Sequence, residues 1–370
     1  MFGTHHTIYV DLSINSVCVA LAEAPTNKKH FKIIATRTAH FNDNHEHYHK
    51  ALAALGMRLQ ELIQLLTREY TIKHYDVVFF VHSPLCTSRS VQHTYTFKKE
   101  TVITKLHIQE VLNSARKTAQ EKGTEGAASV FREYITSIAL NGYPTDVPQG
   151  KTATEATCTI VQETLSGGVM HTIIEPVIRG GIKYEMYNYA QLVGVMLGST
   201  AQEGHTHFGL AEITPEACEI TFYAKRTLER SMIIPVGSRI ILDAAEKHLH
   251  VTHEFIHGLL KASGEQSLSE DVQKSIDGLV TESAAVFKNI LQEQHADITL
   301  FPPKMYLITE RGTEQFWVSV LSRAFENQKL VPEKIVIDGK RLEYTITHDP
   351  AITIGIYAHQ TTDHVITNTQ

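Results

Sequence analysis

Ile8-Tyr9-Val10-Asp11-Leu12-Ser13-Ile14-Asn15 is the first of three stretches in which an apolar strand runs into a turn that carries an acid, a hydroxyl or both. The second is Leu210-Ala211-Glu212-Ile213-Thr214-Pro215-Glu216-Ala217, and the third is Tyr306-Leu307-Ile308-Thr309-Glu310-Arg311-Gly312-Thr313. Phosphate-binding and adenosine-contacting loops occupy such turns, because backbone amides and hydroxyls converge there. Three of them in this order predict a nucleotide cradle built from two halves.

The bulk composition is that of an ordinary globular protein. With 370 residues, 42% hydrophobic and 20% charged, the chain can bury a sizeable core, and its length predicts two to three domains. A formal net charge of −6, with no lysine or arginine block, disfavours a nucleic-acid partner. No signal peptide and no apolar run of roughly 18 residues is present, so we expect a cytoplasmic protein without a membrane helix.

The four cysteines are widely spaced, and three of them lie in apolar strand-like runs. This usage favours buried thiols over a disulfide framework or a CxxC metal site. The cysteines are Cys18, Cys86, Cys158 and Cys218.

Strands and helices alternate along the chain. Period-2 and continuous apolar runs predict strands at 8–12, 17–22, 31–35, 76–81, 134–140, 152–161, 220–224, 231–235, 305–309 and 334–337. Three- and four-residue apolar spacing predicts helices at 49–70, 104–122, 187–196, 240–245, 267–291 and 314–325. The second meander, from Leu210, repeats the first, and the segment after Ser83-Pro84 predicts a small α+β insertion.

That insertion carries the most specific motifs of the chain. They are Asp76-Val77-Val78-Phe79-Phe80-Val81-His82-Ser83-Pro84, then Ser88-Arg89-Ser90, then Asn141-Gly142-Tyr143 and Pro148-Gln149-Gly150-Lys151. Together with Ile234-Pro235-Val236-Gly237, they resemble the FtsA/PilM group of the actin-like ATPase superfamily, with proline where the group has glycine after the serine. The resemblance covers nearly the whole chain.

The resemblance implies an α/β chain with an actin-like (ribonuclease H-like) two-half fold and an FtsA-type α+β subdomain inserted in the first half. It divides the chain into the first actin-like subdomain (1–75 and 166–205), the inserted subdomain (76–165), the second actin-like subdomain (206–243 and 299–370) and a helical subdomain flanking the cleft (244–298).

The first loop departs from the phosphate-binding pattern of this group. The group has glycine and two hydroxyl residues after the aspartate, because a side chain at the glycine blocks the approach of backbone amides to phosphate. Here Asp11 is kept, while Ser13, Ile14 and Asn15 occupy the turn. Isoleucine adds bulk and offers no hydrogen bond to a phosphate.

The other two loops depart further. Glu212 stands for an aspartate and Thr214-Pro215 for paired glycines, while Glu216 adds a negative charge beside the expected phosphates and Glu219 stands for a later acid. In the third loop only Gly312 remains of three glycines, preceded by Glu310 and Arg311 and followed by Thr313. We therefore expect a vestigial nucleotide cleft and no confident catalytic residue.

The resemblance implies three more residues of that cleft, by their position relative to the motifs of the group. They are Gly237, in the loop after the second phosphate segment, and Glu254 and His257, where the group has a helix flanking the adenosine. ATP with Mg²⁺ is the candidate ligand of this cleft.

A competing motif belongs to another class of protein. His253-Glu254-Phe255-Ile256-His257 matches the HExxH pattern of zinc peptidases, in which both histidines ligate zinc and the glutamate acts as general base. The chain has 22 histidines, Leu260 and Ser263 stand where a metzincin needs glycine and histidine, and no third ligand is marked. A zinc site at His253 and His257 is thus a candidate only, and His45, His47 and His49 are read as a solvated loop.

The resemblance implies a cytoplasmic scaffold of a membrane-associated assembly, in cell division or type IV pilus biogenesis, with weak or no ATPase activity. Protein partners at the inner membrane would tether it, because 358–370 lacks the wide apolar face and basic residues of an amphipathic anchor. Self-association is left open. The alternatives are an active ATP-binding protein of the same group and an HExxH zinc peptidase.

Overall fold

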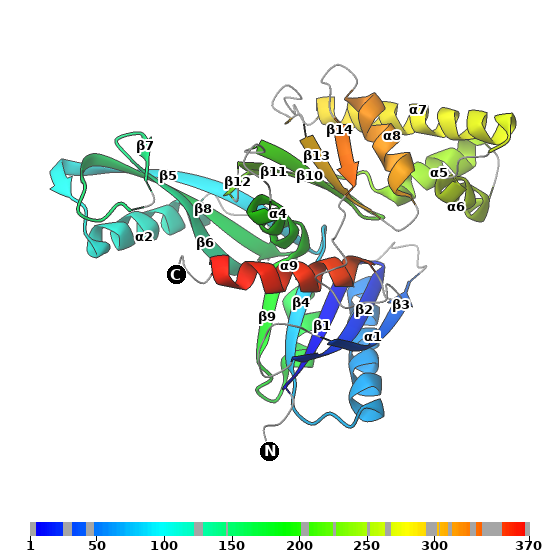
Figure 1. Cartoon of the computed structure of the whole chain (residues 1–370), viewed down its shortest axis with the longest axis horizontal. Coiled ribbons are helices and arrows are strands. Elements are labelled where there is room, and N and C mark those ends of the chain that lie inside the picture. The colour runs from blue at the N-terminus through cyan, green and yellow to red at the C-terminus, as the bar shows by residue number, and fades with distance from the viewer. Residues whose placement is uncertain are drawn as a thin grey trace.

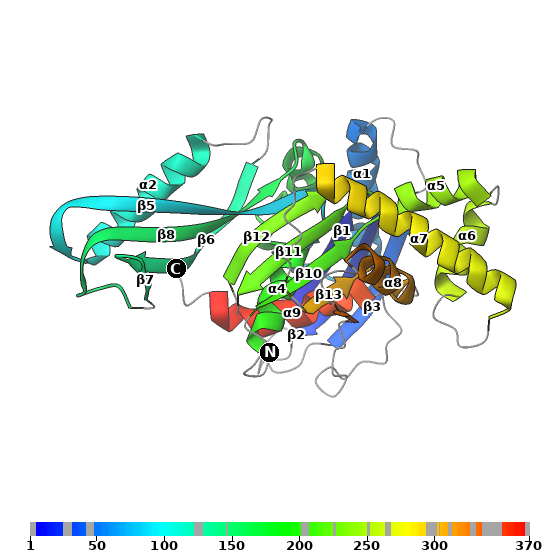
Figure 2. The ribbon, with the colours of Figure 1, turned by 90° about the horizontal axis from the view of Figure 1, so that it is seen from above.

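The computed structural model describes residues 5–24, 32–41, 48–121, 129–145, 147–200, 207–224, 227–249, 252–262, 268–293, 302, 304–309, 313–325, 331–334 and 350–366. Three sheets organise these residues, and an elongated lobe extends from a body formed by the other two (Figures 1 and 2).

The first sheet, in the order β3-β2-β1-β4-β9, joins an antiparallel meander to parallel strands. β1 pairs antiparallel with β2 and β2 with β3, whereas β4 runs parallel to both β1 and β9. The strands are β1 His5–Ser13, β2 Ser16–Ala24, β3 Lys32–His40, β4 Asp76–Val81 and β9 Tyr184–Asn188.

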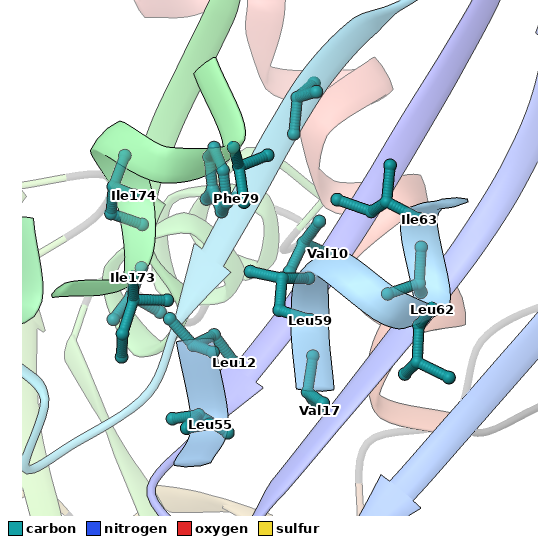
Figure 3. Close-up of a cluster of buried hydrophobic side chains, with 14 of the residues drawn as sticks. Val10, Leu12, Val17, Leu55, Leu59, Leu62, Ile63, Phe79, Ile173 and Ile174 are labelled. Carbon is teal, nitrogen blue, oxygen red and sulfur yellow. The ribbon is translucent and has the colours of Figure 1, made fainter. Parts of the chain in front are cut away.

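One face of this sheet is covered by helix α1 (Tyr48–Glu69). Its leucines recur every three or four residues, so they form one stripe that packs on Val10, Leu12 and Phe79 (Figure 3). The π-helical turn η1 (Met170–Ile174), which α3 (Glu175–Ile178) follows, closes the same core with Ile173.

The second sheet, β12-β11-β10-β13-β14, repeats this plan. An antiparallel meander is again followed by parallel strands. The strands are β10 His207–Ile213, β11 Cys218–Ala224, β12 Thr227–Ile234, β13 Lys304–Ile308 and β14 Val331–Lys334, and the helices of this half are α5 Ser238–Leu249, α6 His253–Ala262, α7 Glu270–Glu293 and α8 Glu314–Ala324. Phe287, Phe316 and Trp317, all fully buried, centre its core.

The third sheet, β5-β8-β6-β7, is antiparallel and makes up the extended lobe. Its elements are β5 Cys86–Val102, α2 Lys105–Glu121, β6 Ser129–Leu140, β7 Tyr143–Pro144 and β8 Thr152–Leu165. Cys86 pairs with Leu165 at the end next to the body, and Val102 pairs with Thr152 at the far end. We refer to this far end as the distal tip.

Two helices connect the halves. α4 (Tyr189–Thr200) is apolar on all sides, and the Tyr223 hydroxyl of β11 donates to the carbonyl of Ala190 at 3.2 Å and to Gln191 Oε1 at 3.0 Å. α9 (Pro350–Ile366) returns from the second half to lie against the first sheet, where Ile352 and Ile356 are fully buried (Figure 1).

The predicted α/β, two-half actin-like architecture with an α+β insertion is confirmed, and three local expectations are corrected. Strand 76–81, expected to open the inserted subdomain, is β4 of the first sheet, because it hydrogen-bonds in parallel to β1. The expected helix at 187–196 begins only at 189, after strand β9, and residues 350–366, assigned to the second half, form α9, which packs on the first.

All four cysteines are buried and free, as expected. No helix in the described ranges has the length and apolar character needed to cross a membrane. Part of the predicted capping segment at 267–270 lies outside the described residues, and Ser269 precedes α7, its Oγ 3.5 Å from the Val272 amide.

Candidate functional site at the junction of the halves

The side chain of His82 lies between the two halves and contacts an acid from each. Its Nε2 is 3.0 Å from Asp11 Oδ2 on β1, and its Nδ1 hydrogen-bonds Glu212 Oε1 on β10. All three residues are buried, with Glu212 only 1% exposed. Asp11 and Glu212 occupy equivalent places in the repeated plan, so His82 joins the two predicted phosphate loops.

Strand pairing explains how His82 reaches this place. β4 runs parallel to β1, and the His82 amide continues the ladder by donating to the Leu12 carbonyl at 2.9 Å. Because side chains at the carboxyl ends of parallel strands meet at one edge of a sheet, His82 lies beside Asp11. A turn through a cis Ser83–Pro84 bond follows, and the ring of Tyr189 lies 4.1 Å from the imidazole, centroid to centroid.

The two acids determine the charge of His82. Burial lowers its pKa, but the charges of Asp11 and Glu212 and their hydrogen bonds outweigh burial and hold the pKa well above its ordinary value. The imidazolium then donates from both ring nitrogens, one to each half. A buried cation therefore lies between two acids that would otherwise face each other across the junction.

A second link joins the tips of the same loops. Asn15 Nδ2, from the β1–β2 turn, donates to Glu216 Oε1 in the β10–β11 turn. Arg239 Nη2 lies 3.6 Å from the same oxygen. Burial raises the pKa of Glu216, while the Asn15 amide and the Arg239 charge oppose the rise. The predicted negative charge beside the phosphates is therefore engaged with the protein itself.

The hydroxyls and amides expected to face a phosphate are also engaged. Ser13 Oγ lies 3.0 Å from Ser16 Oγ, and Thr214 Oγ1 donates to the Ala217 carbonyl at 2.9 Å. At the start of α5, the amides of Ser238 and Arg239 donate to the carbonyls of Thr214 and Pro215 at 3.0 and 2.9 Å. The hydroxyls and amides named here therefore have hydrogen-bond partners within the protein.

Gly237 makes the approach of α5 to this loop possible. A β-carbon at this position would lie 2.2 Å from the Pro215 carbonyl oxygen and 2.4 Å from that of Thr214. Both neighbours are backbone atoms, so neither can rotate away. Gly237 was predicted as part of a nucleotide cleft, and the structure places it in a contact between helix and loop.

A buried acid cluster lies next to the junction. Glu219 pairs directly with Glu212 across β10 and β11, and Glu163 accepts from the Asn188 amide at 3.1 Å. Burial, and then the charge of Glu212, raise the pKa of Glu219 to about 8, and burial raises that of Glu163. The raised pKa values of Glu219 and Glu163 limit the negative charge that this buried cluster carries.

Of the remaining predicted residues, the structure describes the side chains of Thr313 and Glu254. Thr313 is buried, with its Oγ1 3.1 Å from Thr309 Oγ1, whereas Gly312, Glu310 and Arg311 are not described. Glu254 is exposed on α6.

The zinc candidate on α6 gains no further ligand from the structure. His253 and His257 lie on the α6 backbone, one turn apart, and their side chains are outside the description. Among the described residues, no group of three histidine, cysteine or acidic side chains is placed to hold a metal. His45 and His47 are not described, and His49, expected in a loop, lies in the first turn of α1.

Sequence reasoning did not single out His82 as a site residue. It noted the motif through Ser83-Pro84 without assigning the histidine a role. The signal was available: His82 is the first polar residue after a continuous apolar strand, the position from which side chains enter a site in parallel sheets. Asn188, the last residue of β9, was missed because β9 itself was not predicted.

The residues at the junction do not fit a bound nucleotide. The imidazole fills the space between the acids, the loop tips are hydrogen-bonded to each other, and the α5 amides already have acceptors. The donors named above each have a partner within the protein.

Comparisons with known proteins support the fold. No protein-family model matches the chain, and no curated protein matches its sequence. The chain is similar to a solved structure described as the PilM-PilN type IV pilus biogenesis complex, at TM-score 0.62 and 13% identity over 96% of this chain and 98% of that one. It is also similar to a diol dehydratase-reactivating factor in nucleotide-free form, at TM-score 0.50 and 8% identity over 97% and 100%.

A third similar solved structure is described as a protein with actin-like ATPase fold and unknown function from Bacteroides thetaiotaomicron, at TM-score 0.40 and 7% identity over 96% of each chain. The likeness to PilM spans both halves and the inserted lobe, and the repeated sheets show the internal duplication independently. The chain therefore has the actin-like ATPase fold.

Proposed function

We propose that this chain is a scaffold of the actin-like fold that works by binding protein partners at a membrane-associated assembly, with weak or no ATPase activity. The observation that carries the proposal is the placement of His82 between Asp11 and Glu212. In this arrangement a side chain of the protein, rather than a nucleotide, holds the halves together.

The partner is proposed from the comparison. The similar structure is a complex of PilM with PilN, and a chain of the same fold is expected to receive a protein in a comparable assembly. We infer a partner anchored in the inner membrane, in pilus biogenesis or cell division, that would hold this chain at the cytoplasmic side.

The scaffold reading is tested by the thermal stability of the full chain with Mg-ATP, Mg-ADP and Mg²⁺ alone. A ligand that binds only the folded state at a hundred times its dissociation constant adds roughly 2.7 kcal/mol, which corresponds to a shift of several degrees. We expect no shift with either nucleotide. A shift of several degrees that requires the nucleotide would make the active ATP-binding alternative correct.

A control variant keeps a negative result informative. Asn15→Gly together with His82→Gly removes the two side chains that link the phosphate loops of the halves. If this folded variant gains a nucleotide-dependent shift and the natural chain does not, the side chains themselves exclude the nucleotide. Zinc content after purification, compared with His253→Ala, tests the peptidase alternative in the same preparations.

A further inference from the structure

The distal tip concentrates the exposed apolar side chains of the described part of the chain. Tyr143 is 78% exposed, Leu106 68% and Val147 67%, the three highest values among the large hydrophobic residues described, and Val102 at the same end is 54% exposed. Exposed apolar groups that occur singly need no explanation, whereas a group of them marks an interaction surface.

Strand register shows that these residues share one end of the lobe. Val102 closes β5 opposite Thr152, and Tyr143 pairs with Leu140 at the end of β6. The loop before β8 folds back on the start of α2, since the Ile103 amide donates to the Lys151 carbonyl and the Gly150 amide to the Ile103 carbonyl, both at 2.8 Å. Leu106 and Val147 flank that contact along the chain.

Lysines surround the apolar side chains. Lys98, Lys99, Lys105 and Lys151 are all exposed, and Lys151 Nζ donates to Thr145 Oγ1 at 2.6 Å. Between 98 and 105, three lysines and Glu100 leave a formal excess of two positive charges, whereas Lys151 has Asp146 and Glu155 near it in the sequence. The whole chain carries −6, so segment 98–105 has the opposite sign to the molecule.

The shape of the tip favours a flat partner. It is the end of a lobe that projects from the body along the longest axis of the molecule (Figures 1 and 2). A projecting end with aromatic, aliphatic and lysine side chains can meet a plane without the body touching it. Such a mixture suits the bilayer interface, where apolar groups enter the headgroup layer and lysines remain beside anionic lipid.

We propose that the distal tip docks directly on an anionic membrane surface. Net negative charge elsewhere would be repelled by the same surface, so the lobe would point toward the bilayer. The interaction is a peripheral contact of modest strength that acts in addition to a tethering partner. It does not depend on the proposed scaffold role, because the purified chain alone is sufficient to measure it.

The test is sedimentation of the full chain with vesicles of phosphatidylcholine, with and without phosphatidylglycerol. We expect binding that requires phosphatidylglycerol and is lost in molar salt, because exposed charge pairs are screened. Each of Lys98→Ala, Lys99→Ala and Lys105→Ala should weaken binding roughly fivefold, the effect of one lysine near an anionic surface. Leu106→Ser with Tyr143→Ser should weaken it further without lowering the melting temperature.

Matched controls replace lysine and apolar side chains elsewhere on the surface. Lys73→Ala, Lys183→Ala, Met57→Ser and Phe255→Ser alter exposed residues away from the tip and should leave vesicle binding unchanged. Equal binding by tip and control variants, or no binding to anionic vesicles, would overturn the proposal. So would concentration-dependent association of the natural chain that only the tip variants abolish, since the tip would then be an interface between copies.

Discussion

The junction of the halves and the distal tip depart from ordinary residue placement in opposite directions. At the junction, Asp11, His82 and Glu212 are charged and buried. At the tip, Leu106 and Tyr143 are apolar and exposed. Burying ionisable groups costs desolvation free energy, and exposing a group of apolar side chains carries a risk of aggregation. A purely structural role would avoid both. The difference teaches that the junction must specify one arrangement of the halves, whereas the tip must stay available to something outside the chain.

The largest expected effect comes from removing the cation at the junction. His82→Leu leaves Asp11 and Glu212 buried without their partner, which costs about 3–5 kcal/mol of unfolding free energy. Urea denaturation followed by circular dichroism measures the loss. The triple variant with Asp11→Asn and Glu212→Gln should recover most of it, because neutral amides remove the unpaired charges.

A matched histidine variant separates this effect from a general loss of histidine. His171→Ala removes an exposed side chain that pairs with Glu175 on the surface, and it should leave stability unchanged. If His82→Leu is as mild as His171→Ala, the junction does not depend on the imidazolium, and the contrast with the tip fails.

A second effect follows from the pH dependence of Glu219. Its folded-state pKa of about 8 exceeds the unfolded value near 4.5, so the native state binds more protons between these values and stability falls as pH rises. His82 acts in the same direction: its contribution is complete below pH 6.5 and is lost as pH rises through its raised folded pKa. Melting temperature should therefore decline from pH 6 to pH 9.

Glu219→Gln should flatten this decline and stabilise the chain at pH 8 by on the order of 4 kcal/mol, since each pKa unit corresponds to about 1.4 kcal/mol. The amide can still accept from Ser231 Oγ, which lies 2.9 Å from Glu219 Oε1. A variant with the same slope as the natural chain would show that Glu219 is ionised without penalty.

A third, smaller effect tests the contact between α5 and the second loop. Gly237→Ala forces a β-carbon against two backbone carbonyls and should cost about 1–3 kcal/mol. Gly258→Ala, on α6 with open space around it, should instead be neutral or stabilising by up to about 1 kcal/mol. Equal melting temperatures for the two variants would indicate that the loop yields easily.

The smallest effect is expected at the tip. Leu106→Ser and Tyr143→Ser should each change the unfolding free energy by less than about 0.5 kcal/mol, because neither side chain is buried. Differential scanning calorimetry measures this directly. A large loss at either position would make the tip part of the stable core and remove the contrast with the junction.

Much of the fold could be predicted from periodicity, since the leucine stripe of α1 and the apolar run of β4 are local signals. β9 was missed because Tyr184–Asn188 is short and runs into α4 without a turn residue. α9 was missed because its residues Ile352, Thr353, Ile354 and Ile356 are β-branched and Gly355 lies among them, a composition that disfavours a helix until tertiary contacts support it.

The candidate site was harder to predict than the fold. Each loop could be located, and Asp11 and Glu212 do lie close together through one side chain. The link itself depends on His82, which is 71 residues from Asp11 and 130 from Glu212. Such a contact is fixed by the mutual placement of two sheets, which no local pattern encodes.

Helix α9 is synthesised long after the sheet that it covers. Gly355 of α9 packs directly on the Phe80 ring, since a β-carbon at this position would lie 2.6 Å from the ring. The Tyr189 hydroxyl also donates to the Ala351 carbonyl at 3.0 Å. The first sheet is translated by residue 188, but this covering emerges only after 350. At ribosomal speeds the sheet waits on the order of ten to thirty seconds with that face open, a window in which a chaperone or an early partner can bind it.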